Sequence, residues 1–209
     1  MLQRKSPRMP LEKKADPNTK DKNVAQMATK PAEGGGTRAN GHVQAQGGKK
    51  LEASQATLDK FVKDYEKKHG ALHPSVSVSF DPDLEAAGTT NFGGAVTIGS
   101  SAFSSAANLR STLVHELGAH VEQIRSGNFG TSREGDLVNE IEAYRLEESS
   151  RRETGLKGSD LKDVRSEIST RLDELKKVSP EYYGRVQAGN YRLNPRDACS
   201  PSTCNLGAF

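Results

Sequence analysis

Two histidines and a glutamate lie close together in one apolar segment, residues 113–124. These residues are His115, Glu116 and His120. Neutral imidazoles supply the nitrogen ligands that zinc prefers, and an adjacent carboxylate can take the proton from a metal-bound water. Their presence in one short segment predicts a catalytic metal site, with the histidines as ligands and Glu116 as the base.

The spacing of the two histidines constrains how such a site can form. The segment has the apolar period of an amphipathic helix, and His115 and His120 are five residues apart. On a regular α-helix five steps leave two side chains about 140° apart, too far round to share one ion. One π-type turn would bring them to nearly the same face, and Gly118 makes that distortion easier. We therefore expect a π-bulge between the histidines.

Two further carboxylates stand on the next predicted helix. Glu140 and Glu142 alternate there with apolar residues, among them Val138 and Ile141. Burying a carboxylate on such a helix costs several kcal/mol unless the group is paired or binds a metal. Both glutamates are therefore candidate ligands.

The two segments together resemble the gluzincin class of zinc metallopeptidases, which carry a His-Glu-x-x-His motif on one helix and a glutamate ligand on the next. Here the motif is His-Glu-x-x-x-His, which is similar to the variant of the dipeptidyl peptidase III family, a family that binds zinc despite the inserted residue. The resemblance covers roughly residues 75–150. It implies that the strand at Val96–Ile98 offers its edge to a peptide substrate.

The third zinc ligand follows from this resemblance and has two possible assignments. The run Glu142–Leu146 is similar to the glutamate helix of the anthrax lethal factor group. Glu140, followed by Ala143, is similar to the thermolysin-type and dipeptidyl peptidase III arrangements. We favour Glu142 as the ligand, with Glu140 orienting an imidazole, and keep the reverse assignment open.

The resemblance also implies a reaction. Glu116 would take a proton from the zinc-bound water as it attacks a peptide carbonyl, and would then deliver that proton to the departing amine. A tyrosine often adds a hydrogen bond to the oxyanion in such enzymes. By residue type alone the candidates are Tyr182, Tyr183 and Tyr191.

The elements that would position these residues form an α+β pattern. Apolar spacing predicts helices at 51–69, from Ser104 or Ser105 to 124, from about 134 to 155, and from Ser159 to Pro180. Short strands are predicted at 76–80 and 95–98, with a turn-rich stretch at 88–94 between them. This order predicts an α+β fold. The resemblance sharpens it to a zincin-like fold, with a small sheet packed on an active-site helix and a following glutamate helix.

The charge is divided unevenly along the chain. Residues 1–50 hold eleven Lys and Arg against four Asp and Glu and contain no aromatic residue, so they have a net charge of +7 within a total of +3. Such a segment cannot bury enough apolar area to offset its ordering entropy. We therefore predict a disordered basic leader at 1–50, a zincin-like domain at 51–195 and a C-terminal tail at 196–209.

This layout resembles small bacterial toxins or effectors, and the runs Leu2–Lys5 and His120–Gln123 are similar to proteins encoded with phage-tail-like injection systems. That resemblance implies a protein or peptide substrate and a leader that loads the chain into a secretion apparatus. No apolar run is long enough to span a membrane, and no Sec-type signal is present. We expect a chain made in the cytoplasm and exported or injected.

Other readings remain open from the sequence. The chain could be a zincin-fold peptide-binding module without activity, or a basic-tailed interaction protein; nucleic-acid binding is disfavoured because the leader's arginines are dispersed. Two histidines and a carboxylate also suit iron, manganese or cobalt. His42, His69 and His73 are predicted to lie on the surface. Cys199 and Cys204 are predicted to form a terminal bridge or to be free thiols.

Overall fold

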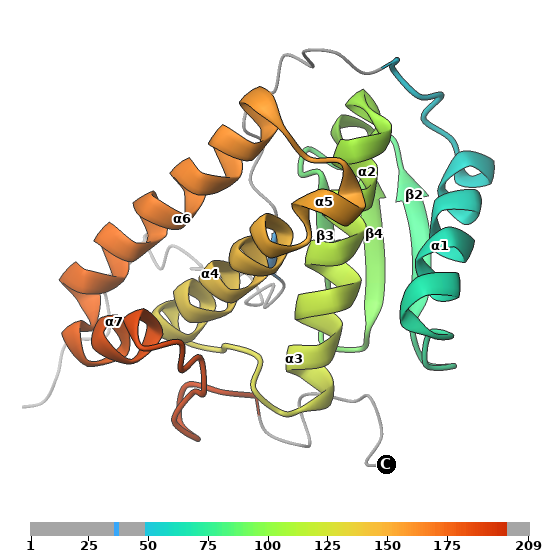
Figure 1. Cartoon of the computed structure of the whole chain (residues 1–209). Helices are drawn as coiled ribbons and strands as arrows, with labels where there is room; N and C mark the ends of the chain where they lie inside the picture. The colour runs from blue at the N-terminus through green and yellow to red at the C-terminus, as the bar shows by residue number, and fades with distance from the viewer. Residues whose placement is uncertain (1–35, 38–48, 200–209) are drawn as a thin grey trace, which may run out of the picture. The chain divides into compact units, whose positions relative to one another are not determined.

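The structure, a computed structural model, describes residues 36–37 and 49–199 (Figure 1). In that part of the chain a small mixed sheet is combined with helices, which confirms the α+β class. Residues 36–37 fall inside the predicted leader and form a strand. The rest of the leader up to residue 48, including His42, lies outside the described residues, as do residues 200–209 of the predicted tail.

The sheet has the strand order β1-β3-β4-β2. Strand β2 (Ser77–Asp81) runs parallel to β4 (Ala95–Gly99), and β3 (Gly88–Thr90) pairs with β4 antiparallel on its other side. Strand β1 (Gly36–Thr37) pairs antiparallel with β3. Because β4 has a partner on each side, the expectation that this strand offers a free edge is corrected.

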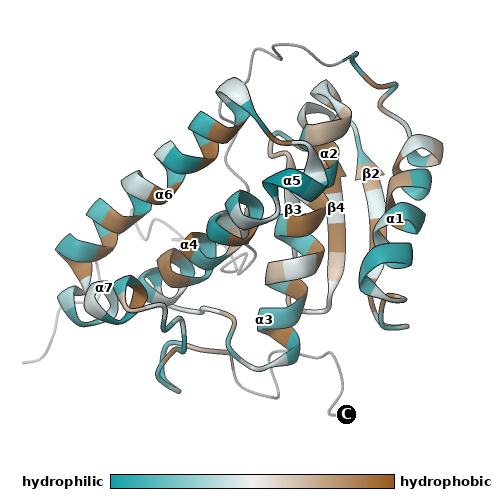
Figure 2. Ribbon diagram, in the orientation of Figure 1, coloured by the Kyte–Doolittle hydropathy of each residue, from teal (hydrophilic) through white to brown (hydrophobic). Residues whose placement is uncertain are grey.

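Strand β4 anchors the sheet to the core. Val96 and Ile98 are fully buried, whereas Ala95 and Thr97 are half-buried, as the period of two requires. Figure 2 shows the brown of apolar residues along β4. Strand β3, which falls in the stretch expected to be turns, carries the sequence Gly-Thr-Thr and has no apolar alternation to reveal it.

The histidine-bearing helix is one continuous rod made of three parts. Helix α2 (Ala106–Leu113) passes into a π-helical segment, η2 (Val114–His120), and then into α3 (Val121–Arg125). The backbone stays in the right-handed helical region at both junctions. Ser105 caps the rod, because its Oγ accepts a hydrogen bond from the Asn108 amide at 3.0 Å.

The remaining helices surround this rod. They are α1 (Gln55–His69), the 3-10 helix η1 (Ser100–Ser104), α4 (Arg133–Ser149), α5 (Arg151–Thr154), α6 (Gly158–Val178) and α7 (Pro180–Gln187). Helix α6 begins one residue before Ser159, so the predicted cap lies inside the first turn. Pro180 follows the end of α6 as predicted, and it also opens α7, which the sequence did not predict.

Helix α4 lies between two other helices. It packs against η2 on one side and against α6 on the other, as Figure 1 shows. Its buried positions accordingly cover most of its circumference, including Val138, Glu140, Ile141 and Tyr144. The helix that carries the predicted glutamates is therefore enclosed rather than half-exposed.

The turn between the histidine rod and α4 is tightly packed. A Cβ at Gly130 would overlap the backbone of Gly135, and a Cβ at Gly135 would lie 2.6 Å from the Asp197 carbonyl oxygen. Gly130 also forms an isolated antiparallel bridge with Ala198. The adjacent Cys199 is disulfide-bonded, and Cys204 lies outside the described residues.

Within the described residues, no helix has the length and apolar character needed to cross a bilayer.

Candidate metal centre

The π-helical turn brings the two predicted histidines together. The Nε2 atoms of His115 and His120 are 3.0 Å apart, and both side chains are fully buried. Gly118 lies within this turn, and a Cβ there would be 3.1 Å from Leu146 Cδ2 on α4. The π-bulge expected from the five-residue spacing is therefore confirmed, and the missing side chain also allows α4 to pack closely.

Each imidazole has its other nitrogen held by an acceptor. His115 Nδ1 lies 2.7 Å from Glu147 Oε1, and His120 Nδ1 lies 2.8 Å from Gln123 Oε1. A donor at each Nδ1 leaves the lone pair of a neutral imidazole on Nε2. Both lone pairs then point toward the same small volume, an arrangement that is repulsive unless a cation or a proton lies between them.

Glu140 completes this group from α4. Its Oε1 lies 3.2 Å from His120 Nε2 and its Oε2 lies 3.7 Å from His115 Nε2. The ligand atoms of the three residues all lie within 4.8 Å of one another. The carboxylate is 3% exposed, and neither oxygen takes part in a hydrogen bond. Buried oxygens without donors are costly, and a metal ion would satisfy both.

The charge on Glu140 is favoured by its surroundings. Burial alone would raise its pKa, but His120, His115 and Arg171 together hold the pKa of Glu140 below its usual value. Arg171 comes from α6; its Nη2 lies 3.7 Å from Glu140 Oε2, and its guanidinium lies over the ring of Tyr144. Against the effect of burial, Glu140 in turn raises the pKa of His120 to about 9. Without a metal ion the carboxylate is therefore an anion beside a protonated His120, and a bound metal ion would replace that proton.

Glu142 has a different role from the one we favoured. Its Oε2 accepts a hydrogen bond from Gln123 Nε2 at 2.8 Å, and Gln123 in turn holds His120. Glu142 is thus outside the metal group and supports a ligand indirectly. Among the two glutamates, the geometry favours Glu140 over Glu142 as the third candidate ligand, because α4 places Glu140 beside the two imidazoles.

The residues that orient the imidazoles include two that the sequence reasoning missed. Glu147 is fully buried and also accepts a hydrogen bond from Ser111 Oγ. It lies two helical turns after Glu140, a spacing of seven that places both carboxylates on one face of α4. Gln123 is three residues after His120, within reach of the same turn. The sequence signals that could have identified these two residues are the interval of seven from Glu140 to Glu147 and the interval of three from His120 to Gln123.

Glu116 is hydrogen-bonded to strand β3 through one of its carboxylate oxygens. Its Oε2 accepts a hydrogen bond from Thr90 Oγ1 at 2.7 Å, while its buried Oε1 has no hydrogen bond. Burial raises the pKa of Glu116, although the nearby imidazoles of His115 and His120 partly oppose this. A Cβ at Gly88 would lie 2.7 Å from Oε1, so the glycine provides the space that the carboxylate occupies.

The three tyrosines proposed as oxyanion partners have other contacts. Tyr182 Oη donates to Asp197 Oδ2 at 2.8 Å, and Tyr191 Oη accepts from Arg145 Nη1 at 2.6 Å. The ring of Tyr183 lies under the Lys176 amine. The aromatic contacts of the metal group come instead from Tyr144, edge-on against His115 with ring centroids 4.8 Å apart, and from Phe129, edge-on against His120 at 5.7 Å.

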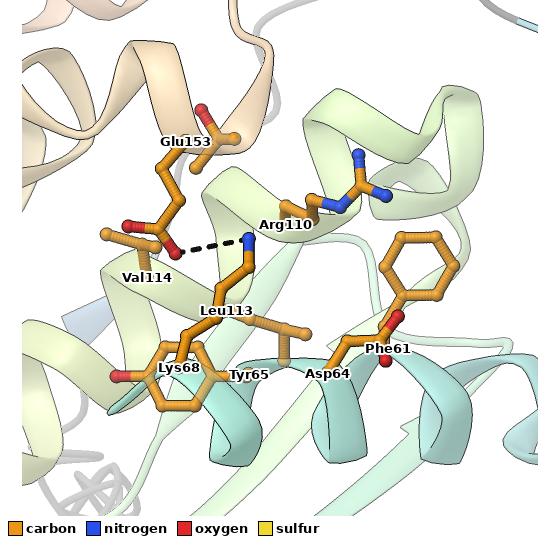
Figure 3. A pocket seen from close by; sticks show the side chains of 9 residues that line it. Phe61, Asp64, Tyr65, Lys68, Arg110, Leu113, Val114 and Glu153 are labelled. Atoms are coloured by element: carbon orange, nitrogen blue, oxygen red, sulfur yellow. Dashed lines mark ion pairs between the residues drawn. The ribbon is translucent and has the colours of Figure 1, made fainter. Parts of the chain in front are cut away.

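A second histidine–carboxylate pair lies at the surface between α1 and α5. His69 Nε2 is 2.8 Å from Glu153 Oε1, and Lys68 Nζ lies 3.5 Å from the same oxygen. Figure 3 shows the Lys68–Glu153 pair beside Tyr65. His69 is exposed, as predicted, and His73 is half-buried with Nδ1 2.6 Å from Ser75 Oγ.

No family model, curated protein or solved structure matches this chain. The metal centre is therefore characterised by its own geometry. His115, His120 and Glu140 form a buried group that could hold a metal ion.

Proposed function

We propose that this protein is a metal-dependent peptidase of the zincin type, with His115, His120 and Glu140 as the ligands. The observation that carries the proposal is the convergence of two imidazole lone pairs and a carboxylate without hydrogen bonds on one buried point. Two histidines and one glutamate are a ligand set used by catalytic zinc. The zincin type in particular is supported by the order of the elements, which is a sheet, then a histidine helix, then a glutamate helix.

Glu116 is the proposed general base. Thr90 holds Oε2 of this carboxylate, so Oε1 is the atom available to accept a proton. When bound, the metal would supply a water of lowered pKa and polarise the peptide carbonyl. Because burial raises the pKa of Glu116, its carboxyl group holds a proton more readily and can return that proton to the departing amine.

The test of this proposal combines a metal assay with a cleavage assay. We expect about one zinc per chain in the wild type, loss of that metal in His120→Ala and Glu140→Ala, and retention in the matched control Glu142→Ala. Glu116→Gln should keep the metal while losing at least about a hundredfold in peptide cleavage, the usual contribution of a general base. Cleavage that survives in Glu116→Gln would remove this residue from the mechanism.

A second candidate function is a metal-stabilised peptide-binding module without catalysis. The observation in its favour is the burial of the ligands, since His115 and His120 are 0% exposed and Glu140 is 3% exposed. Structural metal sites are closed, whereas catalytic sites keep an open position. In this case chelation would lower the melting temperature, and no peptide would be cleaved.

The toxin or effector role and export through residues 1–50 stay predictions from the sequence.

A further inference from the structure

Strand β3 is the part of the sheet that lies next to the proposed base. Thr90, its last residue, donates the hydrogen bond that holds Glu116, and Gly88, its first residue, contacts the same carboxylate. One side of β3 is paired with β4. The other side is the edge along which an added polypeptide would pass close to Glu116.

That edge is occupied by two residues of the chain itself. Gly36 is paired with Thr90 and Thr37 with Thr89, so β1 runs antiparallel to β3. Strand β1 also contacts α4, the helix that carries Glu140. Figure 1 shows the short blue strand between β3 and α4. The backbone at 36–37 therefore contacts both the strand whose Thr90 holds Glu116 and the helix that carries Glu140.

We propose that the outer edge of β3 is the substrate-binding edge and that Gly36–Thr37 occupy it as an internal pseudosubstrate. The substrate class is an extended polypeptide segment that adds to β3 as an antiparallel strand. This inference rests on the proposed function, because it assigns to the same site both its substrate geometry and its inhibition.

The physical basis is strand addition. An extended peptide that joins a sheet edge gains backbone hydrogen bonds whatever its sequence, and side-chain pockets add selectivity. Gly36 has no side chain, so at this position the pairing with Thr90 depends on the backbone alone. In the described part of the chain this ladder consists of two residue pairs, and a competing peptide that forms more pairs would displace it.

The tether strengthens this weak contact. A segment of the same chain reaches the edge with an effective concentration on the order of millimolar. If the tethered segment has an intrinsic Kd of about 100 μM for the edge, a free peptide would bind about tenfold more weakly in its presence. The buried state of His115 and His120 is consistent with a site whose access is blocked.

A binding experiment tests the inference separately from catalysis. The full chain carrying Glu116→Gln is compared with the same chain carrying Gly36→Pro and Thr37→Pro in addition, because proline removes the backbone donors of β1. The probe is a fluorescein-labelled synthetic peptide with the sequence of residues 33–40. We expect the proline variant to bind it about tenfold more tightly.

The matched control places prolines at Gly47 and Gly48, in the same N-terminal segment and outside the described residues. The control should bind the probe as weakly as Glu116→Gln alone. Equal affinity in all three chains, with equal metal content and circular dichroism, would overturn the pseudosubstrate assignment.

A cleavage experiment with Glu116 intact separates the two proposals. We expect Gly36→Pro with Thr37→Pro to raise kcat/KM on a short unstructured peptide about tenfold. If the proline variant binds the probe more tightly and cleaves nothing, the peptidase function fails and the docking edge stands. If wild type and variant cleave equally and bind equally, the peptidase stands and the inhibitory role of β1 fails.

Discussion

Two histidine–glutamate pairs in this protein have nearly the same length and very different surroundings. His115 and Glu147 are 2.7 Å apart, and both side chains are 0% exposed. His69 and Glu153 are 2.8 Å apart, and each side chain is 35% exposed. Water screens the second pair, so its contribution to stability is small. In the first pair, removing one residue would leave the polar group of the other buried, which is costly. The main effect of this pair is therefore to hold the His115 imidazole in position.

The comparison shows which properties distinguish the pair in the candidate metal centre from the pair at the surface. The outer pair ties the end of α1 to α5 and involves Lys68 as well. In the inner pair, the second ring nitrogen of the histidine faces His120 and Glu140. Distance alone does not separate the two cases. Burial and the convergence of further ligand atoms do.

The two pairs should differ most in the effect of replacing the histidine by alanine. His115→Ala should abolish metal binding and lower the free energy of unfolding by about 3–5 kcal/mol, because Glu147 is left buried without its partner. His69→Ala should keep the metal and change stability by less than about 1 kcal/mol. Metal analysis and urea unfolding check both variants. Similar losses of metal and of stability in both variants would show that the buried pair and the surface pair do not differ in role.

The next effect concerns the carboxylates. Glu147→Gln keeps an oxygen that can accept from His115 Nδ1 and removes the charge, so we expect metal affinity to fall about 10–100-fold, as for other groups that orient metal ligands. Glu153→Gln is the matched control and should leave metal affinity unchanged. Competition with a zinc-binding dye measures both. An unchanged affinity in Glu147→Gln would show that Glu147 does not tune the site.

The smallest effect is the pH dependence of the outer pair. Partial burial alone would raise the pKa of Glu153, but His69 and Lys68 lower it below the usual 4.5. The pair therefore stabilises the fold above pH 4.5, and this contribution is lost as the pH falls below that value through the lowered pKa. Unfolding of wild type and Glu153→Gln should differ slightly at pH 6 and converge at low pH. A difference that grows on acidification would contradict this assignment.

The sequence predicted the π-turn and the meeting of the two histidines because both depend on spacing within one helix. It could not choose between Glu140 and Glu142, because α4 is covered by η2 on one side and by α6 on the other. An enclosed helix has no single apolar stripe, so nothing local indicates which glutamate faces the histidines.

Two other departures have similar causes. Strand β3 is three residues long and is defined by pairing with β4 and β1, which are distant in sequence. Helix α7 has eight residues, of which Tyr182 and Val186 are buried, too few to form a clear period. Elements defined by their tertiary partners are the ones that the sequence left unassigned.

The close contact of Gly130 with Gly135 has a consequence for how the protein tolerates sequence change. A Cβ at Gly130 would overlap the backbone of Gly135 in the first turn of α4, so this glycine lets the connecting turn pack directly on the start of the helix that carries Glu140. A methyl group at Gly130 would force the two helices apart and displace Glu140 from the imidazoles without altering any ligand. Saturation mutagenesis should therefore find this turn as intolerant as the ligands themselves.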